Sequence, residues 1–359
     1  MARVLVTGGA GYVGSHACKA LARAGHEPIV LDNLSQGHRA LVRWGPLVVG
    51  DIADPVCVDG VFREYRPDAV MHFAAIASVG ESMVDPAVYY RINIGGTMTI
   101  LDAMRDHDVA PLVFSSSCAV YGCPPTALIV EESSLEPVNP YGASKKMMER
   151  IIADYGQAYG HRSLCLRYFN AGGADPDGEA GESHDPETHV IPLLLMAATG
   201  RIPQFDIYGT DYPTPDGSAI RDYVHVSDLA EAHVAALDYL LQGGASTVVN
   251  LGTGCGTSVL QLIDAVERAT GRTVPRVARP RRPGDPPILV ASNEKAGRVL
   301  GWRPRMTEPV DMIATAHAWM ERPLADRRAV PVLAAGPQAH PLGKRGPASS
   351  HSPAKVRQA

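Results

Sequence analysis

Two residues four positions apart, Tyr141 and Lys145, have side chains suited to proton transfer at an alcohol. They follow Pro140, which is typical of the first turn of a helix, and residues four apart share one helical face. A tyrosine of pKa about 10 needs about 4 kcal/mol to be half ionised near pH 7, and a nearby ammonium group supplies part of it. Ser117, just beyond the apolar segment 111–115, can hydrogen-bond to the same substrate oxygen. The alternative is an ordinary amphipathic helix, because a Tyr-x-x-x-Lys pattern occurs often by chance.

A glycine-rich turn near the N-terminus has the composition of a phosphate-binding loop. Gly8, Gly11 and Gly14 follow the apolar segment 3–7 and open a helical pattern at residues 12–24. In such a loop the first glycine permits a tight turn, the second lets backbone N–H groups approach a pyrophosphate, and the third lets the helix pack on the strand. Many glycine-rich turns are only structural, so the loop needs a second observation beside it.

Asp32 supplies that observation. It ends the next strand-like segment, 27–32, and lies about 20 residues beyond the loop, where a carboxylate can accept hydrogen bonds from an adenine ribose. Its charge would repel the 2′-phosphate of NADP, and residues 33–35 contain no arginine to compensate. We therefore expect NAD as the cofactor, with its positive nicotinamide ring as the second aid to ionising Tyr141. The alternative is that Asp32 only caps a turn.

Short segments rich in β-branched residues alternate with helical patterns along the chain. Continuous apolar segments between helices are typical of strands that are buried on both faces of a parallel sheet. The predicted strands are residues 3–7, 27–32, 46–50, 69–73, 111–115, 163–168 and 248–251. The predicted fold class is α/β, a Rossmann-type doubly wound parallel sheet with a smaller α/β substrate-binding lobe.

After Asn170 the alternation of strand and helix patterns gives way to loops rich in Gly, Pro and Asp between shorter helices. We assign residues 1–170 plus 221–255 to an NAD-binding Rossmann domain and residues 171–220 plus 256–322 to the smaller lobe. Residues 323–359 are rich in Pro, Ala, Gly, Ser and Arg without an apolar period, which predicts a disordered tail.

Composition and charge restrict the class of protein. The 359 residues are 45% apolar and 20% charged, which is typical of a soluble globular chain with a large core. The net charge is −5 and residues 323–359 contribute +5, so the remainder carries about −10, which does not favour nucleic-acid binding. We find no Cys-x-x-Cys pair, no signal peptide and no apolar run of membrane-spanning length. We therefore expect a cytoplasmic protein with neither nucleic-acid nor membrane partners.

These motifs and further segments resemble the extended short-chain dehydrogenase/reductase family, and within it the UDP-glucose 4-epimerases, over nearly all of residues 2–320. The matching segments are residues 4–15, 31–34, 72–74, 79–82, 115–122, 141–145, 166–170, 209–212, 221–223 and 281–285. The resemblance implies that Tyr141 takes the proton of the sugar 4-hydroxyl while hydride passes from C4 to tightly held NAD. The transient 4-keto sugar then takes hydride back on its other face. Lys145 would lower the pKa of Tyr141 and hold the nicotinamide ribose, and Ser117 would position the 4-oxygen.

The same resemblance assigns contacts with NAD and with a UDP-sugar substrate. It places NAD against Gly8, Gly11, Tyr12, Val13, Gly14, Asp32, Asn33, Asp51, Ile52, Phe73, Ala74, Ala75, Asn93, Ser115, Tyr141, Lys145, Tyr168 and Phe169. It places the UDP-sugar against Ser117, Tyr141, Asn170, His189, Val190, Tyr208, Arg221, Arg282 and Asp285. The two arginines suit bidentate hydrogen bonds with the diphosphate, and the alternative for each is a solvated loop charge.

Three positions depart from the pattern of that family. Ala77 stands where a lysine often touches the cofactor, and Ile92 stands where an asparagine is common, although Asn93 is kept. Leu289 takes the place of a residue that limits the room around the sugar 2-position. UDP-xylose, UDP-arabinose and UDP-N-acetylhexosamines therefore stay open as substrates.

Two other interpretations use the same scaffold. A sugar-nucleotide 4,6-dehydratase needs an acid and a base beside the serine, where this chain has Cys118 and Ala119. A non-catalytic NAD-sensing protein would not need Ser117, Tyr141 and Lys145 together. We therefore favour the epimerase over both.

No metal is expected from the spacing of the potential ligands. His184, Asp185, Glu187 and His189 lie on a proline-interrupted loop without helical or Cys-x-x-Cys-like spacing, and the predicted chemistry needs no metal. If the resemblance extends to assembly, helices around residues 86–107 and 144–159 form a four-helix homodimer interface.

Overall fold

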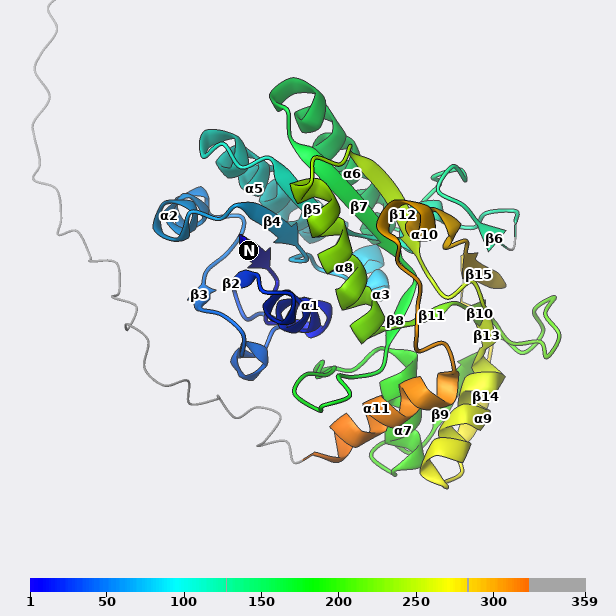
Figure 1. Ribbon diagram of the computed structural model, residues 1–359. Coiled ribbons are helices and arrows are strands. Elements are labelled where there is room, and N and C mark those ends of the chain that lie inside the picture. Colours follow the sequence, from blue (N-terminus) through cyan, green and yellow to red (C-terminus); the bar gives the residue numbers. More distant parts are fainter. Residues whose placement is uncertain (127, 283, 323–359) are drawn as a thin grey trace, which may run out of the picture.

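A parallel sheet of seven strands, in the order β3-β2-β1-β4-β5-β7-β12, forms the centre of the larger part of the molecule (Figure 1). The computed structural model describes residues 1–126, 128–282 and 284–322, and the predicted tail lies outside them. The strands are β1 (Arg3–Thr7), β2 (Glu27–Asp32), β3 (Leu47–Val49), β4 (Ala69–His72), β5 (Pro111–Ser117), β7 (Arg162–Tyr168) and β12 (Thr247–Leu251). The order runs outward from β1 in both directions, so the predicted doubly wound fold is confirmed. β5 runs on to Ser117, because this residue still pairs with Tyr168 of β7.

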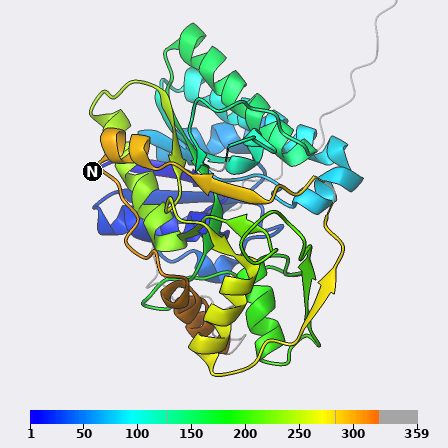
Figure 2. The same cartoon turned by 90° about the vertical axis from the view of Figure 1, so that its right-hand side faces the viewer.

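Helices cover both faces of this sheet (Figure 1, Figure 2). One face carries α1 (Tyr12–Arg23), α8 (Val226–Leu241) and α10 (Glu294–Leu300), and the other carries α2 (Pro55–Tyr65), α5 (Gly95–Asp106) and α6 (Pro140–Tyr159). Val4 and Val6 of β1 belong to the core under α1 and α8, whereas Leu5 belongs to the core under α2 and α5. Burial on both faces explains why the strands are continuous apolar segments.

The smaller lobe has an apolar core of its own. It is built from α7 (Val190–Ala198), α9 (Val259–Thr270) and α11 (Pro309–Glu321), with the parallel strand pair β9 (Phe205–Tyr208) and β14 (Arg276–Arg279). α10 follows the lobe segment in sequence but packs on α8 and β12, with Ala296 in the core of the large sheet. This helix therefore lies with the large sheet, although the sequence analysis assigned it to the lobe.

Short strands connect the lobe to the large sheet. They are β6 (Leu128–Ile129), β8 (Asn170–Gly172), β10 (Ile220–Arg221), β11 (Tyr223–His225), β13 (Thr257–Ser258) and β15 (Ile288–Ala291). β8 pairs with β11, while β13, β10, β15 and β6 form a four-stranded sheet. The pairings place Asn170 opposite Tyr223 and Arg221 opposite Leu289.

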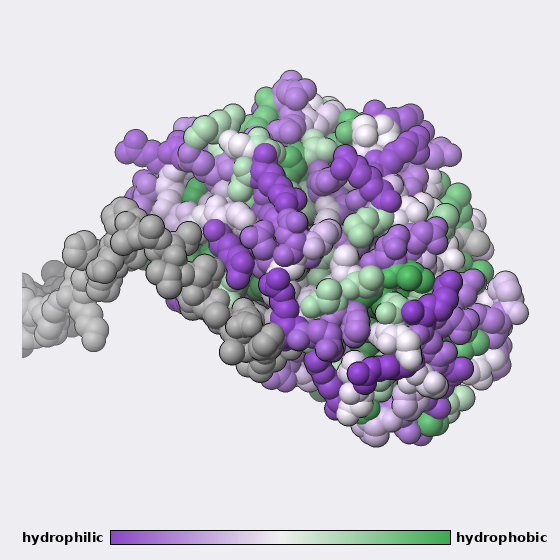
Figure 3. All heavy atoms as spheres, turned by 60° about the horizontal axis from the view of Figure 1, so that its bottom comes forward, coloured by the Kyte–Doolittle hydropathy of each residue, from purple (hydrophilic) through white to green (hydrophobic). Residues whose placement is uncertain are grey.

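The remaining helical elements are short. They are the 3-10 turns Arg39–Leu41 and Cys118–Tyr121, α3 (Val79–Val84), α4 (Pro86–Tyr89) and a π-helical turn over Tyr90–Ile94. Among the residues that the structure describes, no helix combines the length and the apolar character needed to cross a bilayer. Seen from the lobe end, most of the surface is hydrophilic, with small apolar patches between the polar side chains (Figure 3).

Candidate active site

The glycine loop between β1 and α1 leaves no room for side chains. Gly8 has a φ of +73°, and a Cβ on it would lie 2.7 Å from the Ala74 backbone nitrogen. A Cβ on Gly14 would overlap the Gly8 carbonyl oxygen. Gly11 is the N-cap of α1 and has no side chain to cap the helix, so the first-turn N–H groups can face an anion. The loop therefore fits the pyrophosphate of a dinucleotide.

Asp32 lies at the C-terminal end of β2 and is 8% exposed. One carboxylate oxygen accepts a hydrogen bond from the Ala10 amide at 3.0 Å, and the other accepts one from the Leu34 amide at 2.8 Å. Burial raises the pKa of Asp32, and these two amides act against the rise. Asp32 therefore does cap a turn, and it also fixes the glycine loop. Each oxygen keeps a further acceptor position for a ribose hydroxyl.

Several predicted cofactor residues follow the strand ends at the same edge of the sheet. The amides of Phe73 and Ala74, after β4, donate to the Thr7 carbonyl of β1 at 3.0 and 3.1 Å. The side-chain Nδ2 of Asn33 donates to the Asp51 carboxylate at 3.1 Å and joins the segments after β2 and β3. Of the other predicted contacts, Tyr12 and Val13 begin α1, Ile52 follows β3 and Ala75 follows β4.

Asn93 is buried in the π-helical turn and ties two segments together. Its Oδ1 accepts a hydrogen bond from the Ile76 amide at 2.8 Å, and its Nδ2 donates to the Ile76 carbonyl at 3.1 Å and to the Ser144 hydroxyl at 3.0 Å. Both of its amide protons are thus used to anchor the chain after β4 to α6. Ala77, next along that chain, is exposed. A contact between Asn93 and NAD stays a prediction.

The helix α6 carries Tyr141 and Lys145 on one buried face, as predicted from their spacing. Asn139 caps this helix by accepting a hydrogen bond from the Gly142 amide at 2.8 Å, and a proline occupies the first helical position. Tyr141 is 8% exposed and Lys145 is 3% exposed. The Lys145 ammonium donates a hydrogen bond to the Ser115 carbonyl of β5 at 2.8 Å.

The protein by itself does not lower the pKa of Tyr141. Burial, followed by the neighbouring Tyr168, raises the pKa of Tyr141 well above its ordinary value of 10, while hydrogen bonding with Ser117 lowers it. Burial lowers the pKa of Lys145 to about 7, against the effect of the Glu149 carboxylate. The sequence analysis expected Lys145 to help ionise Tyr141. In the structure burial is the largest effect on the pKa of Tyr141 and raises it, so the help from Lys145 stays a prediction.

A buried polar network fixes α6 against β5 and β7. The hydroxyls of Ser115 and Tyr168 bond to each other at 2.8 Å. Behind them the Arg167 guanidinium forms an ion pair with the Glu149 carboxylate at 2.6 Å, and Glu149 also accepts from the Ser116 hydroxyl at 2.5 Å. The sequence analysis missed Glu149 and Arg167. The position of Glu149 four residues after the lysine, on the same helical face, is the signal that could have found it.

Two arginines of the predicted diphosphate site are held by other predicted contacts. The Arg221 guanidinium forms an ion pair with the Asp285 carboxylate. The Arg282 guanidinium lies 3.9 Å from the centre of the Tyr208 ring, which is a cation–π contact. These contacts orient both guanidinium groups, but Arg282 is exposed on a loop, so the binding of the diphosphate by the two arginines stays a prediction.

Leu289 and Asn170 border the junction between the lobe and the large sheet. Leu289 lies opposite Arg221 and packs against a small core that contains Phe169. Asn170 begins β8 directly after Phe169, and its backbone N–H donates to the Asp222 carbonyl at 2.9 Å. The strand pairings thus bring together Asn170, Arg221 and Leu289, which are far apart in the sequence and are all predicted to lie near the UDP-sugar.

His189 is the N-cap of α7, just before Val190, and belongs to a cluster of histidine and glutamate side chains. The Glu182 carboxylate, 7% exposed, forms ion pairs with His184 at 3.0 Å and with His189. Burial opposes the ionisation of Glu182, but the two imidazoles lower its pKa to about 2. The sequence analysis missed Glu182 because an irregular loop brings it to the histidines. Asp185, which that analysis did consider, is not part of the cluster.

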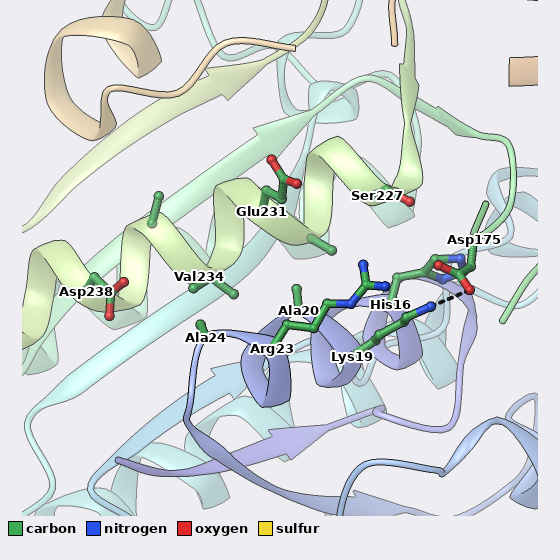
Figure 4. A pocket seen from close by; sticks show the side chains of 12 residues that line it. His16, Lys19, Ala20, Arg23, Ala24, Asp175, Ser227, Glu231, Val234 and Asp238 are labelled. Carbon is green, nitrogen blue, oxygen red and sulfur yellow. Dashed lines mark hydrogen bonds and ion pairs between the residues drawn. The ribbon is translucent and has the colours of Figure 1, made fainter. Parts of the chain in front are cut away.

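A pocket of about 380 Å³ lies between α1 and α8 (Figure 4). None of its lining residues is a predicted contact of NAD or sugar. Lys19 and Asp175 meet in it with a nitrogen–oxygen distance of 2.6 Å, which ties α1 to the loop after β8. This pocket therefore lies apart from the predicted NAD and sugar contacts.

A serine from β5 that meets the tyrosine and lysine of α6 beside a dinucleotide loop is typical of the short-chain dehydrogenases and reductases. Residues 4–252 match the NAD dependent epimerase/dehydratase family, and the chain belongs to that family. This membership agrees with the choice of NAD that Asp32 indicated.

Relatives of the chain make the resemblance more specific. The UDP-glucose 4-epimerase of Rhizobium meliloti (strain 1021) is 50% identical over 317 residues, which are 88% of this chain and 95% of the relative. The crystal structure of UDP-glucose 4-epimerase from Brucella ovis in complex with NAD has a TM-score of 0.87 at 51% identity and covers 89% of this chain and 98% of that one. The enzyme from Stenotrophomonas maltophila, with bound NAD and formylated UDP-arabinopyranose, has a TM-score of 0.86 at 40% identity, with 89% and 98% covered. The predicted resemblance is confirmed.

Proposed function

We propose that this protein is a UDP-glucose 4-epimerase, which interconverts UDP-glucose and UDP-galactose without net oxidation. The proposal rests mainly on the meeting of Ser117 of β5 with Tyr141 and Lys145 of α6, in a chain whose glycine loop fits a dinucleotide. The chain is also half identical to an enzyme of this name over almost the whole length of that enzyme. Cys118 and Ala119, next to the serine, offer no acid and base for a 4,6-dehydratase.

Each residue of the catalytic group has a separate task. When bound, NAD supplies a hydride acceptor and donor for the sugar C4 and a positive charge beside Tyr141. Tyr141 as phenolate accepts the proton of the 4-hydroxyl and later returns it. Lys145 in its protonated form places a second positive charge close to that phenolate, and Ser117 holds the 4-oxygen by a hydrogen bond. Tyr141 needs both charges because burial raises its pKa.

The diphosphate of the substrate is bound by Arg221 of β10 and by Arg282 of the lobe. Guanidinium groups form paired hydrogen bonds with phosphate oxygens, and Arg221 and Arg282 are already oriented by Asp285 and Tyr208. Orientation before binding reduces the side-chain entropy that binding removes. The contacts of His189, Val190 and Asn170 with the UDP-sugar belong to the same proposal.

Leu289 favours a second activity, the epimerisation of UDP-N-acetylhexosamines. A leucine leaves more room beside the sugar 2-position than the tyrosine that stands there in narrow enzymes, and an N-acetyl group needs that room. UDP-pentoses require no additional space, so the same residues can serve UDP-xylose or UDP-arabinose.

We further propose a cytoplasmic homodimer that serves galactose metabolism. α5 and α6 lie side by side and carry the exposed apolar side chains of Met98 and Met147, which are 41% and 46% exposed. A second copy placed there would cover them in a four-helix interface. Light scattering should give the mass of a dimer for the parent and of a monomer for Met98→Glu combined with Met147→Glu. A dimer that survives both changes would place the interface elsewhere.

The decisive experiment uses the purified protein without added NAD. We expect it to convert UDP-glucose to UDP-galactose and the reverse, and to release nicotinamide cofactor when it is denatured. A protein that carries no nicotinamide and turns over no UDP-sugar is not an epimerase. Comparison of UDP-hexoses, UDP-N-acetylhexosamines and UDP-pentoses by kcat/KM then ranks the substrates.

A further inference from the structure

Four side chains near the start of α7, Glu182, His184, Glu187 and His189, have the composition of a transition-metal site. Their two imidazole Nδ1 atoms and two carboxylate oxygens all lie within 4.8 Å of one another. A set of two nitrogens and two oxygens suits zinc and neighbouring first-row metals, whereas magnesium and calcium prefer oxygen ligands alone. We propose that these four side chains bind one divalent cation of the zinc class.

Three of the separations between the ligand atoms are close to those of a coordination sphere. A tetrahedral zinc ion with bonds of about 2.0–2.1 Å holds its ligand atoms about 3.3 Å apart. The observed separations are 3.0 Å for Glu182 and His184, and 3.9 Å from Glu187 to each of the two imidazoles. These values bracket the tetrahedral edge. Only the contact between Glu182 and His189 is closer, and it has to lengthen to admit the ion.

Charge and burial also favour a cation. The side chains of Glu182 and Glu187 are 7% and 9% exposed, so two carboxylates are largely shielded from water. Both imidazoles approach the same oxygen, Oε1 of Glu182. Without a metal, the two rings share that single acceptor. One divalent ion neutralises both carboxylates.

Contacts outside the cluster hold the ligands in place. The Trp319 indole N–H donates to the Glu182 carbonyl at 2.8 Å. The backbone amides of Thr188 and His189 donate to Oε1 of Glu187, the oxygen that faces the two imidazoles, at 2.8 and 2.9 Å. Supporting hydrogen bonds of this kind orient the ligands of a metal and raise its affinity.

The ion would fix the loop 182–189 to the beginning of α7. His189 and Val190, which start this helix, are proposed UDP-sugar contacts, so the metal would position them for the substrate. With its Nδ1 on the metal, His189 keeps only Nε2 for the sugar nucleotide. The effect on the substrate rests on the proposed function, whereas the binding of the metal does not.

The test is a metal analysis of protein purified without a histidine tag, supplied with zinc and then passed through metal-free buffer. Mass spectrometry of the metals should find about one zinc-class ion per chain in the parent. His184→Ala and Glu182→Gln should lower that content at least about fivefold, because a site loses affinity with each ligand. His317→Ala is the matched control, since His317 pairs with Glu321 on α11 outside the cluster and its loss should leave the content unchanged.

Thermal unfolding provides a second measurement that does not depend on activity. A chelator should lower the Tm of the parent and added zinc should restore it, because an ion that binds only the folded state stabilises it. His184→Ala, whose side chain is 26% exposed, is expected to fold and to respond to neither reagent. The proposal is overturned if the parent holds no more metal than His184→Ala, or if neither the chelator nor added zinc changes the Tm of the parent. In that case the cluster is an ion-pair network only. The proposed epimerase activity is not affected by this result, because the assay without added NAD tests it separately.

Discussion

The Lys145 ammonium donates its hydrogen bond to the Ser115 carbonyl at 2.8 Å, although the centre of the Tyr141 ring is only 6.0 Å away. The position of the lysine is thus set by β5 and not by the tyrosine hydroxyl. Because both side chains are buried, its charge acts on the phenol through a poorly screened environment. Lys145 therefore contributes to catalysis mainly through its charge.

Replacing that charge should change the pH dependence of turnover. In Lys145→Met the phenolate of Tyr141 loses one of the two positive charges near it, so the pKa of Tyr141 rises further. We expect kcat to fall about 100-fold or more, and its half-maximal pH to move upward. Lys146→Met is the matched control, because the neighbouring Lys146 is exposed and donates only to the Leu135 carbonyl. An unchanged pH profile in Lys145→Met would assign the lysine a purely structural role.

Removing the hydroxyl of Tyr141 should separate chemistry from binding. Tyr141→Phe keeps the buried ring but cannot accept the proton, so kcat should drop by about 10²–10⁴-fold. The Kd for UDP, measured by calorimetry, should change less than about threefold, since the nucleotide is proposed to bind at Arg221 and Arg282. If affinity for UDP and turnover fell together, the residue would be needed for the shape of the site.

The glycine loop can be tested with two glycines of similar backbone conformation. Gly8 and Gly25 have φ values of +73° and +83°, but a Cβ on Gly25 would meet nothing within 4 Å. Gly25→Ala should therefore show only the backbone cost, about 1 kcal/mol of unfolding free energy. Gly8→Ala adds a collision with Ala74 and should also lose most of the NAD that denaturation releases. Equal NAD contents in the two variants would contradict the role of the loop.

The sequence predicted the large sheet and the core of the site because their signals are local. Gly8, Asp32 and Tyr141 each stand at a strand end or helix start whose periodicity is visible in a few neighbouring residues. The cluster around Glu182 and the pairing of Arg221 with Asp285 were not predictable in this way. They depend on irregular loops and on strands of two to four residues, where no period specifies which side chains meet.

Four buried histidines should make the protein less stable as the pH falls. Burial lowers the pKa of His72 to about 3 and those of His16, His225 and His233 to about 4. Their unfolded pKa is about 6.5, so between pH 6.5 and about 4 the unfolded chain binds more protons, and the free energy of unfolding decreases as the pH falls. Each histidine adds a slope of at most about 1.4 kcal/mol per pH unit.

Urea unfolding at several pH values between about 7 and 5 measures this slope. His72→Gln should flatten it by the contribution of one histidine, whereas His317→Gln, on the surface of α11, should not. A free energy of unfolding that is constant over this range would mean that the four imidazoles bind protons in the folded state as they do in the unfolded chain.

The breadth of the substrate range should depend on Leu289. A tyrosine in its place would project from β15 beside Arg221 and fill room near the sugar 2-position. We expect Leu289→Tyr to lower kcat/KM for UDP-N-acetylglucosamine at least about tenfold, which is about 1.4 kcal/mol. The kcat/KM for UDP-glucose should change less than about threefold. Leu128→Tyr is the control, because Leu128 lies on β6 of the same small sheet and is 52% exposed. Equal losses of kcat/KM for both substrates would show that the tyrosine disturbs the sheet. If the parent enzyme does not act on the N-acetyl sugar, the proposed second activity is wrong.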